Sequence, residues 1–374
     1  MRPHPSLTAE FVAPRPLEPR ERMGRNEPCW CNSGEKYKKC HLNRENEPAV
    51  NIYEIAQKLR EQFSDGYCSH ALAGPKGCSS KITKAHTVQR QGGLAAIAVE
   101  GHVVAVKPTM EDMVKHSGNP PPRLVGLKSA STFPGFCNKH DSELFRPVEG
   151  KQISFDVNAA FLLSYRAVAY ERFTKFSTLS FLKTFQRMDA GKSYFEQVQI
   201  QQYINIIRAG ITRGMSDIES WKREYDCRLV QGTVDGFYFC FVPFNKLLPV
   251  AACGAFHVEF DFAGRRLQRI SRGDGPFEHV SFNLTSFDGQ SVLLFGWIGS
   301  AEGPAASFVQ SYLDQPRNRQ ANAAVQLSFE LSENVFAHPT WWESLKAKDR
   351  RRLEAVELVE LIEPADPISD AQPA

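Results

Sequence analysis

Four side chains of metal-binding types lie close together near the N-terminus: Cys29, Cys31, Cys40 and His41, in the pattern C-x-C-x8-C-H. Three thiolates and one imidazole form a ligand set that Zn²⁺ takes in closed, tetrahedral structural sites. A segment this short cannot bury enough apolar surface to fold alone, so a bound metal has to supply its folding energy. We therefore predict a small zinc-binding knob over residues 24–43.

The residues around these ligands support the same interpretation. Asn32-Ser33-Gly34 is a turn sequence that reverses the chain between the two ligand pairs. With its ligands, the segment closely resembles the SEC-C motif, the zinc-binding tail of the SecA translocase type, which many bacterial proteins carry. The further residues that match this pattern are Gly24, Arg25, Asn26, Pro28, Ser33, Gly34, Lys36, Tyr37, Lys38 and Lys39.

The resemblance implies a docking module rather than a reaction. SEC-C segments are zinc-held docking sites, in SecA for the SecB chaperone, so we expect the knob to bind a protein or nucleic-acid partner. The chain departs from the usual pattern at Glu27, Trp30, Asn32 and Glu35, and none of these four residues is a ligand. The match covers a small part of the chain, so the rest must be interpreted from its own residues.

A second group of cysteines and histidines follows the knob. Its members are Cys68, His70, Cys78, His86, Cys137 and His140. The preferred ligand set is Cys68, Cys78, Cys137 and His140, because Cys137 and His140 have the C-x-x-H spacing of an ordinary zinc-ligand pair. We predict a second zinc ion in a loop-rich module spanning residues 52–148. His86 in place of His140 is an alternative ligand that the sequence leaves open.

His86 has a further interpretation, because it lies in a β-like run shortly after Cys78. Two zinc-ligand pairs that bracket a hairpin carrying a histidine are similar to the treble-clef HNH nucleases. That resemblance implies that His86 activates water and that Asp141 binds a catalytic Mg²⁺ or Mn²⁺ ion. The chain lacks the tight cysteine knuckles of that family and has Asp141 where a final histidine is usual. A metal-dependent HNH-like endonuclease, for example in defence against foreign DNA, is therefore the alternative function, and a purely structural role for His86 competes with it.

Composition and charge limit the remaining possibilities. The chain has 374 residues, of which 42% are hydrophobic and 11% aromatic, which suits two or three domains with a sizeable core. It has neither an apolar stretch long enough for a bilayer nor the apolar run of a signal peptide, so we expect a cytoplasmic protein without membrane insertion. Nine cysteines suit that reducing compartment if they bind metal or stay reduced. The net charge of +3 does not require a nucleic-acid partner, although ten basic against five acidic residues between positions 67 and 148 permit phosphate contacts.

The pattern of apolar residues predicts an α+β fold. We expect a disordered leader at residues 1–23, a helix at 52–63, and β-like runs at 94–100 and 103–106. Beyond residue 150, the predicted helices are 157–173, 179–188, 195–225, 305–313 and 341–359, and the predicted strands are 229–234, 236–242, 255–262, 280–284, 292–298 and 325–330. These helices and an antiparallel sheet would form a domain of unknown role over residues 150–362, followed by a tail at 363–374. The sequence does not set the oligomeric state.

One short sequence in this region is similar to a nucleotide-binding loop. Gly191-Lys192-Ser193 has the order found at the end of a phosphate-binding loop, but Gln186 stands where that loop requires glycine, and no strand leads into it. We interpret these residues as the start of a helix.

Overall fold

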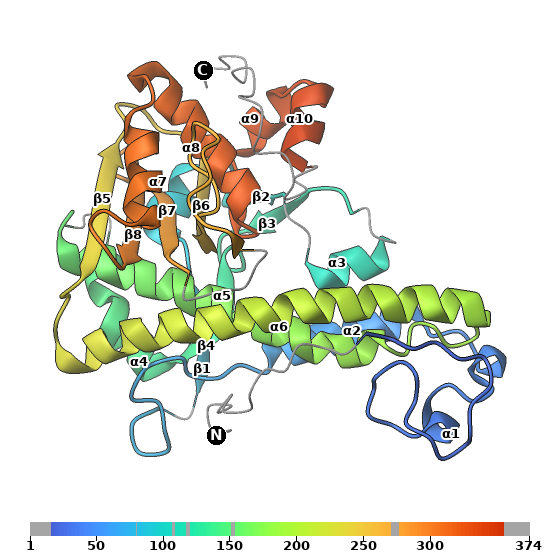
Figure 1. Cartoon of the computed structure of the whole chain (residues 1–374). Helices are drawn as coiled ribbons and strands as arrows, with labels where there is room; N and C mark the ends of the chain where they lie inside the picture. Colours follow the sequence, from blue (N-terminus) through green and yellow to red (C-terminus); the bar gives the residue numbers. More distant parts are fainter. Residues whose placement is uncertain are drawn as a thin grey trace.

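The computed structural model describes residues 16–79, 81–106, 109–116, 120–150, 154–270 and 277–354 of the 374-residue chain. It has the expected α+β architecture, with a seven-stranded sheet, a separate two-stranded pair and helices on both faces of the large sheet (Figure 1). Residues 1–15 of the predicted leader and the tail at 363–374 lie outside the described residues. Among the described residues, no helix has the length and apolar character needed to cross a membrane.

The large sheet has the strand order β3-β2-β9-β6-β7-β8-β5, and each of its pairings is antiparallel. Its strands are β2 His102–Ala105, β3 Arg123–Gly126, β5 Phe237–Pro243, β6 Val250–His257, β7 His279–Phe287, β8 Gln290–Ile298 and β9 Val335–Ala337. A tight turn at Asp288 and Gly289 joins β7 to β8, and the positive φ of both residues, 49° and 80°, suits a two-residue hairpin. Every residue of β7 is buried, so this part of the sheet is covered on both faces.

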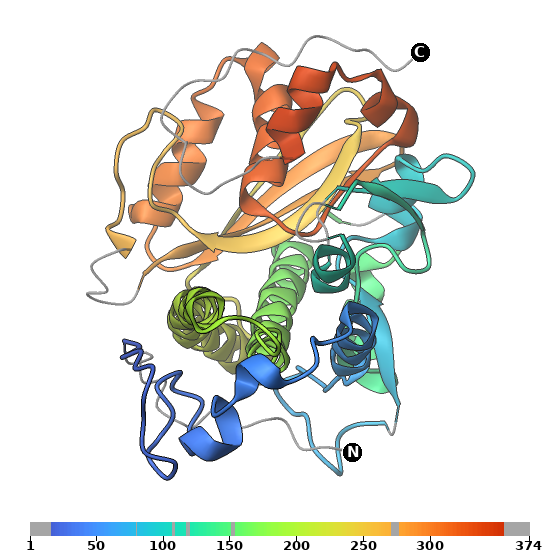
Figure 2. The same ribbon diagram turned by 90° about the vertical axis from the view of Figure 1, so that its right-hand side faces the viewer.

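Helices form the two layers that cover the sheet (Figure 2). One layer contains α7 Pro304–Leu313, α8 Arg317–Leu331, α9 Pro339–Ser344 and α10 Ala347–Glu354. The other layer contains α5 Val157–Phe185, whose buried residues pack with Phe237, Ala255 and Leu294 of the sheet. The hydrophobic core therefore lies on both sides of the central strands.

Helices α5 and α6, the latter spanning Tyr194–Gln231, form a long hairpin that extends beyond the sheet as an arm (Figure 1). Ser193 begins α6 with a capping box shared with Glu196, and Gly232 ends it in the left-handed conformation with a φ of 67°. Helix α2, Ile52–Ser64, packs against the arm. The knob, with α1 Tyr37–Cys40 and the 3₁₀ turn Arg44–Asn46, lies at the end of the arm.

The second cysteine-rich region is built on the two-stranded pair, in which β1 Ile82–His86 is antiparallel to β4 Thr132–Cys137. Helix α4, Asn138–Phe145, follows β4 directly, and a 3₁₀ turn at Arg146–Val148 ends the region. Between β1 and β4 the chain forms a helical turn at Arg90–Leu94, then β2, α3 Met110–Lys115 and β3. Because β2 pairs with β9, the large sheet contains strands from both sides of the domain boundary predicted at residue 150.

Several predicted elements differ from the structure. The predicted strand at 325–330 is part of α8, and the first half of the one at 229–234 continues α6 as far as Gln231. The run at 94–100 begins in a helical turn and has only an isolated bridge between Val99 and His102. Short apolar runs do not distinguish a buried helix from a strand. The predicted helices 157–173 and 179–188 are one helix, because Thr174 and Thr178 donate their hydroxyls to carbonyls within the helix instead of interrupting it.

Candidate metal centres

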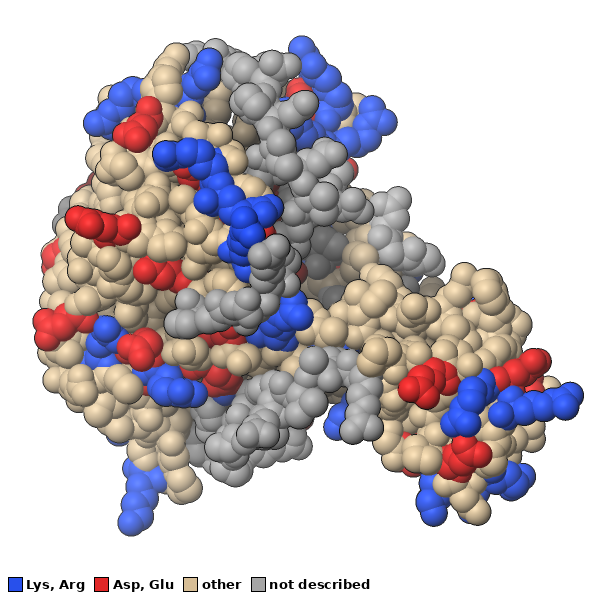
Figure 3. Space-filling model, in the orientation of Figure 1, with Lys and Arg blue, Asp and Glu red and all other residues tan. Residues whose placement is uncertain are grey.

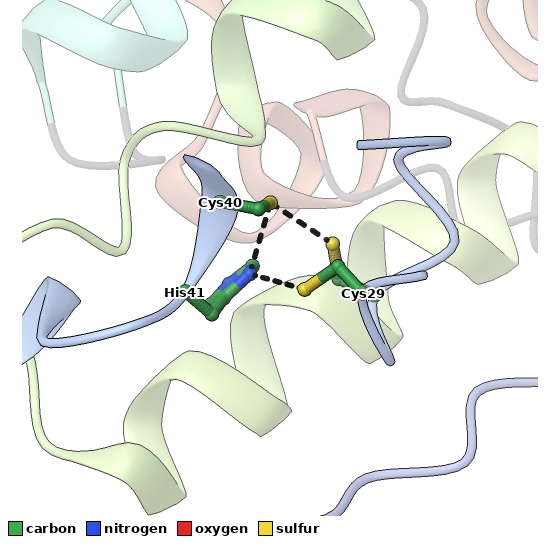
Figure 4. A group of neighbouring side chains, drawn as sticks. Cys29, Cys40 and His41 are labelled. Carbon is green, nitrogen blue, oxygen red and sulfur yellow. Dashed lines mark hydrogen bonds between the residues drawn. The ribbon is translucent and has the colours of Figure 1, made fainter. Parts of the chain in front are cut away.

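The first metal centre brings together the four side chains predicted from the sequence. The sulfur atoms of Cys29, Cys31 and Cys40 and a ring nitrogen of His41 all lie within 4.8 Å of one another. His41 Nδ1 is 3.2 Å from Cys29 Sγ and 3.1 Å from Cys40 Sγ, and Figure 4 shows these three side chains converging on one point. Ligands of a tetrahedral zinc ion lie roughly 3.6 Å apart, so the spacing fits Zn²⁺.

The local fold of the knob explains why these side chains converge. Pro28 and Lys36 form a bridge, and the Cys29 N–H donates to the Glu35 carbonyl at 2.8 Å, so residues 28–36 close into a small hairpin. The reversal uses positive φ at Asn32 and Gly34, as the turn sequence predicts. Helix α1 then carries Cys40 back toward the first cysteine pair.

Without a bound cation, the thiols of this centre have pKa values shifted in opposite directions. Hydrogen bonding to Cys31 and Cys40, with burial, raises the pKa of Cys29, while the contact with Cys29 lowers the pKa of Cys31. Three thiolates at this spacing repel each other, and a divalent cation removes that repulsion. The donor set therefore fits a soft divalent metal such as zinc.

His41 connects the first centre to the arm through a contact that sequence reasoning missed. Its Nδ1 faces the sulfur atoms, and its Nε2–H donates to Asp189 Oδ2 at 2.8 Å. Asp189 is fully buried in the turn between α5 and α6 and also forms an ion pair with Arg44 at 2.6 Å. Burial alone would lower the pKa of His41, but the hydrogen bond to Asp189, together with the contacts with Cys31 and Cys40, raises it to about 11. A carboxylate in this position fixes the tautomer and orientation of a metal-binding histidine.

The second metal centre unites Cys68, Cys78, Cys137 and His140, the preferred set from the sequence, again within 4.8 Å. His140 Nδ1 is 3.3 Å from Cys68 Sγ, 3.6 Å from Cys78 Sγ and 3.4 Å from Cys137 Sγ. Cys137 ends β4 and caps α4, so the last two ligands come from the start of one helix. The two Cys₃His groups are consistent with two zinc ions.

Backbone groups and a neighbouring ring hold these ligands in place. The Gly74 N–H donates to Cys78 Sγ at 3.4 Å, and the His140 N–H donates to Cys137 Sγ at 3.5 Å. Such bonds favour the thiolate form that binds metal. His70 also belongs to the second group of cysteines and histidines in the sequence. Its ring stacks on that of His140, with a centroid distance of 3.9 Å and an interplanar angle of 6°. All nine cysteines lie among the described residues, and all are free of disulfides.

His86 and Asp141, the candidate catalytic residues, lie outside both metal groups. His86 is at the end of β1, and its Nε2–H donates to the Leu127 carbonyl at 3.0 Å. Burial lowers the pKa of His86, so at neutral pH its Nδ1 carries a free lone pair. Asp141 lies in the first turn of α4, and burial raises its pKa. Among the described residues it is His140, and not His86, that lies with the three cysteines of the second centre.

Comparisons with known proteins concern the first centre. Residues 25–43 match the SEC-C motif. The same part of the chain is similar to protein translocase subunit SecA of Pseudomonas putida strains F1, KT2440 and W619, with 57% identity over 30 residues in each case. Each match covers 8% of this chain, which spans only 3% of the length of these relatives. No solved structure matches the chain. Residues 25–43 therefore carry a SEC-C motif, held to the rest of the molecule through a carboxylate 148 residues away from His41.

Proposed function

We propose that this chain is a cytoplasmic zinc protein that uses its SEC-C knob to dock a partner protein. In this proposal residues 24–43 bind one zinc ion, the module at 52–148 binds a second, and the α+β region at 150–362 is the body that carries both. The free state of all nine cysteines agrees with a reducing compartment. The SEC-C match and the similarity to SecA support a docking role.

The main structural support for the docking role is the surface next to the knob. Near its N-terminus α6 exposes Phe195, Tyr203 and Ile206, with 68%, 66% and 64% of their surface accessible. Tyr194 of the same helix packs edge-on against the buried Trp30 of the knob, with ring centroids 6.0 Å apart, so the knob packs directly on the helix that carries these side chains. Large exposed apolar side chains grouped in this way are typical of protein-binding sites.

Charge defines the partner that this surface would suit. The knob exposes Lys36, Lys38 and Lys39, and it forms the lobe at the lower right of Figure 3, where basic and acidic side chains lie close together. Next to that lobe the face of the arm is largely uncharged. A partner with an apolar patch bordered by acidic residues would complement both parts.

Metal content tests the first half of the proposal. Elemental analysis of purified, reduced protein should give two zinc ions per chain, one in Cys40→Ser and one in Cys137→Ser. A wild-type chain with one zinc ion or none would contradict the assignment.

Site-specific crosslinking in cells tests the docking role. A photo-crosslinking residue at Tyr203 should capture a partner that the same residue at exposed Glu302 does not capture. The adduct should disappear in the triple variant Lys36→Glu, Lys38→Glu, Lys39→Glu. Equal labelling at both positions, or none at Tyr203, would refute the docking surface.

A second candidate function is a metal-dependent endonuclease. Two observations favour it. His86 lies on β1 of the β1–β4 strand pair, and Asp141 lies on α4, the helix that follows this pair. The charges of Arg166 and Glu149 act on both residues. In hydrolysis a water oxygen adds to phosphorus as a phosphate ester P–O bond breaks. His86 Nδ1 takes the water proton, and the leaving oxygen takes a proton from solvent.

Incubation with plasmid DNA and RNA in Mg²⁺ or Mn²⁺ tests this function. Cleavage should be lost in His86→Ala, with both zinc ions retained, and kept in the matched control His102→Ala. Cleavage that is absent in the wild type, or unchanged in His86→Ala, would reject His86 as the base.

A further inference from the structure

Arg166 is a buried cation whose hydrogen-bonding capacity is largely unused. It lies on α5 and is fully buried, and its Nη2 donates to Glu149 Oε1 at 2.5 Å. Its guanidinium carbon lies 3.9 Å from the centroid of the Phe145 ring. Among the described residues, its Nε and Nη1 atoms have no hydrogen-bond partner. Leaving buried N–H groups of a cation unpaired is costly, so these two donors are suited to an anionic ligand.

The surroundings of Arg166 bring it together with Asp141. Asp141 and Phe145 are four residues apart on α4, so they share the face of that helix on which the Arg166 guanidinium stacks. Asp141 Oδ1 is also buried without a hydrogen-bond partner within the described part of the chain. An unpaired carboxylate oxygen and unpaired guanidinium donors thus lie on the same side of α4.

Glu149 lies on the solvent side of this group of residues. Its side chain is 42% exposed, whereas that of Arg166 is completely buried. The 3₁₀ turn at Arg146–Val148 follows α4 directly and places Glu149 at the end of Arg166 that faces outward. Val148, the residue before Glu149, is also held in place, because the Gln89 side-chain amide donates to its carbonyl. Gln89 is three residues beyond His86, so β1 and the 3₁₀ turn approach each other here.

We propose that Glu149 and Arg166 complete, with His86 and Asp141, a site for a divalent cation and a phosphate group. The carboxylates of Glu149 and Asp141 are hard oxygen ligands of the kind that Mg²⁺ and Mn²⁺ prefer. The Nε and Nη1 donors of Arg166 bind the phosphate oxygens, since a guanidinium recognises phosphate through paired N–H groups. This inference rests on the endonuclease as the second candidate function and adds two residues to it.

The two added residues have distinct roles. Arg166 is held in orientation by Phe145 and by one oxygen of Glu149, so its remaining donors point in a fixed direction. Lysine at this position would keep the charge but lose the paired geometry. Glu149 binds the cation and orients Arg166, so its loss affects cation binding first.

Binding of Mn²⁺ to the zinc-loaded full chain, followed by electron paramagnetic resonance, tests the role of Glu149. The wild type should bind Mn²⁺, and Glu149→Gln should weaken the affinity at least tenfold. Glu143→Gln is the matched control, because Glu143 is an exposed glutamate at the outer side of the same region, and it should bind like the wild type. Glu149 is half-buried, so its variant is expected to fold.

Calorimetry with thymidine 3′,5′-bisphosphate and Mn²⁺ tests the role of Arg166. Arg166→Lys should lose at least tenfold in affinity for the bisphosphate, and Glu149→Gln should show the same order of loss if the lysine variant does not fold. Unchanged Mn²⁺ and bisphosphate affinities in Glu149→Gln would overturn the inference, while the His86-dependent cleavage assay would still decide the second candidate function. No Mn²⁺ binding by the wild type would overturn the inference directly.

Discussion

Asp189 joins the first metal centre to the helical arm. Its Oδ2 accepts hydrogen bonds from His41 and Gln201, its Oδ1 forms an ion pair with Arg44, and the residue is fully buried. A buried carboxylate with this many charged and polar partners is stable only while all of them are present. The four ligands of the knob are recognisable because they lie close together in sequence, whereas Asp189 has no local signal and is brought to His41 only by the α5–α6 turn.

We expect Asp189→Asn to weaken zinc binding at the first centre about 10- to 100-fold while leaving all four ligands in place. The amide keeps the shape of the side chain but removes the negative charge that orients the His41 imidazole and makes it more basic. Competition with a zinc chelator would measure the affinity. Asp314→Asn, an exposed aspartate on the far side of the sheet, should leave it unchanged. Equal affinities in both variants would mean that Asp189 only supports packing.

His279 should make the fold sensitive to acid. Burial, followed by the charge of His257, lowers the pKa of His279 from 6.5 to about 3, and its ring stacks on Trp221 at 4.1 Å. Between these two values the unfolded chain binds a proton that the folded chain does not, so this contribution to stability is full above pH 6.5 and is lost as the pH falls toward 3.

Urea unfolding at pH 7.5 and 5.5 checks this expectation. The loss of stability over that interval should be smaller in His279→Phe than in the wild type by on the order of 1 kcal/mol. The same substitution at His116, an exposed histidine, should leave the wild-type pH dependence in place. An identical acid loss in wild type and His279→Phe would contradict the buried neutral imidazole.

At the scale of elements, long periodic segments are the predictable part of this fold. The predicted helix at 195–225 is α6, and strands near 236–242, 280–284 and 292–298 are present as β5, β7 and β8. The predicted strand at 325–330 is wrong because its apolar residues are buried in α8 against the sheet, a tertiary context that a six-residue pattern does not reveal. The pairing of β2 with β9 joins residues more than 200 positions apart, and periodicity contains no information about such partners.

The contribution of the α6 capping box to stability can be measured. Ser193 Oγ accepts from the Glu196 N–H, and the Glu196 carboxylate accepts from the Ser193 N–H at 2.9 Å, as the helix start predicted at Gly191-Lys192-Ser193 would require. Ser193→Ala should lower the free energy of unfolding by about 1 kcal/mol and speed hydrogen exchange in residues 189–197. Ser216→Ala, at an exposed position in the middle of α6, should not do so. Unchanged exchange in Ser193→Ala would show that the arm is held by packing alone.

At the scale of the whole molecule, the two metal centres support structures of different size. The knob has a small cluster of its own, Cys29, Trp30, Cys31 and Tyr37, and reaches the body only at the end of the arm. The second centre adjoins the core, since Phe136 and Phe145, on either side of its last two ligands, are fully buried against α5. Lys222 of α6 also donates to the carbonyl of Ser69, the residue after the ligand Cys68, at 2.7 Å.

Removing one ligand from each centre should therefore have unequal effects. Cys40→Ser should lose one zinc ion and speed hydrogen exchange in residues 16–46 and in the α5–α6 turn around Asp189, with the main urea transition unchanged, because few core contacts depend on the knob. Cys137→Ser should also lose one zinc ion but lower the stability of α5, α6 and the sheet together by more than about 3 kcal/mol, because the second centre holds part of the shared core. Segment-resolved hydrogen exchange with urea unfolding separates the two cases. If Cys40→Ser exposes α5 as much as Cys137→Ser does, the Asp189 contact couples the knob to the whole fold, and the two centres form one cooperative unit.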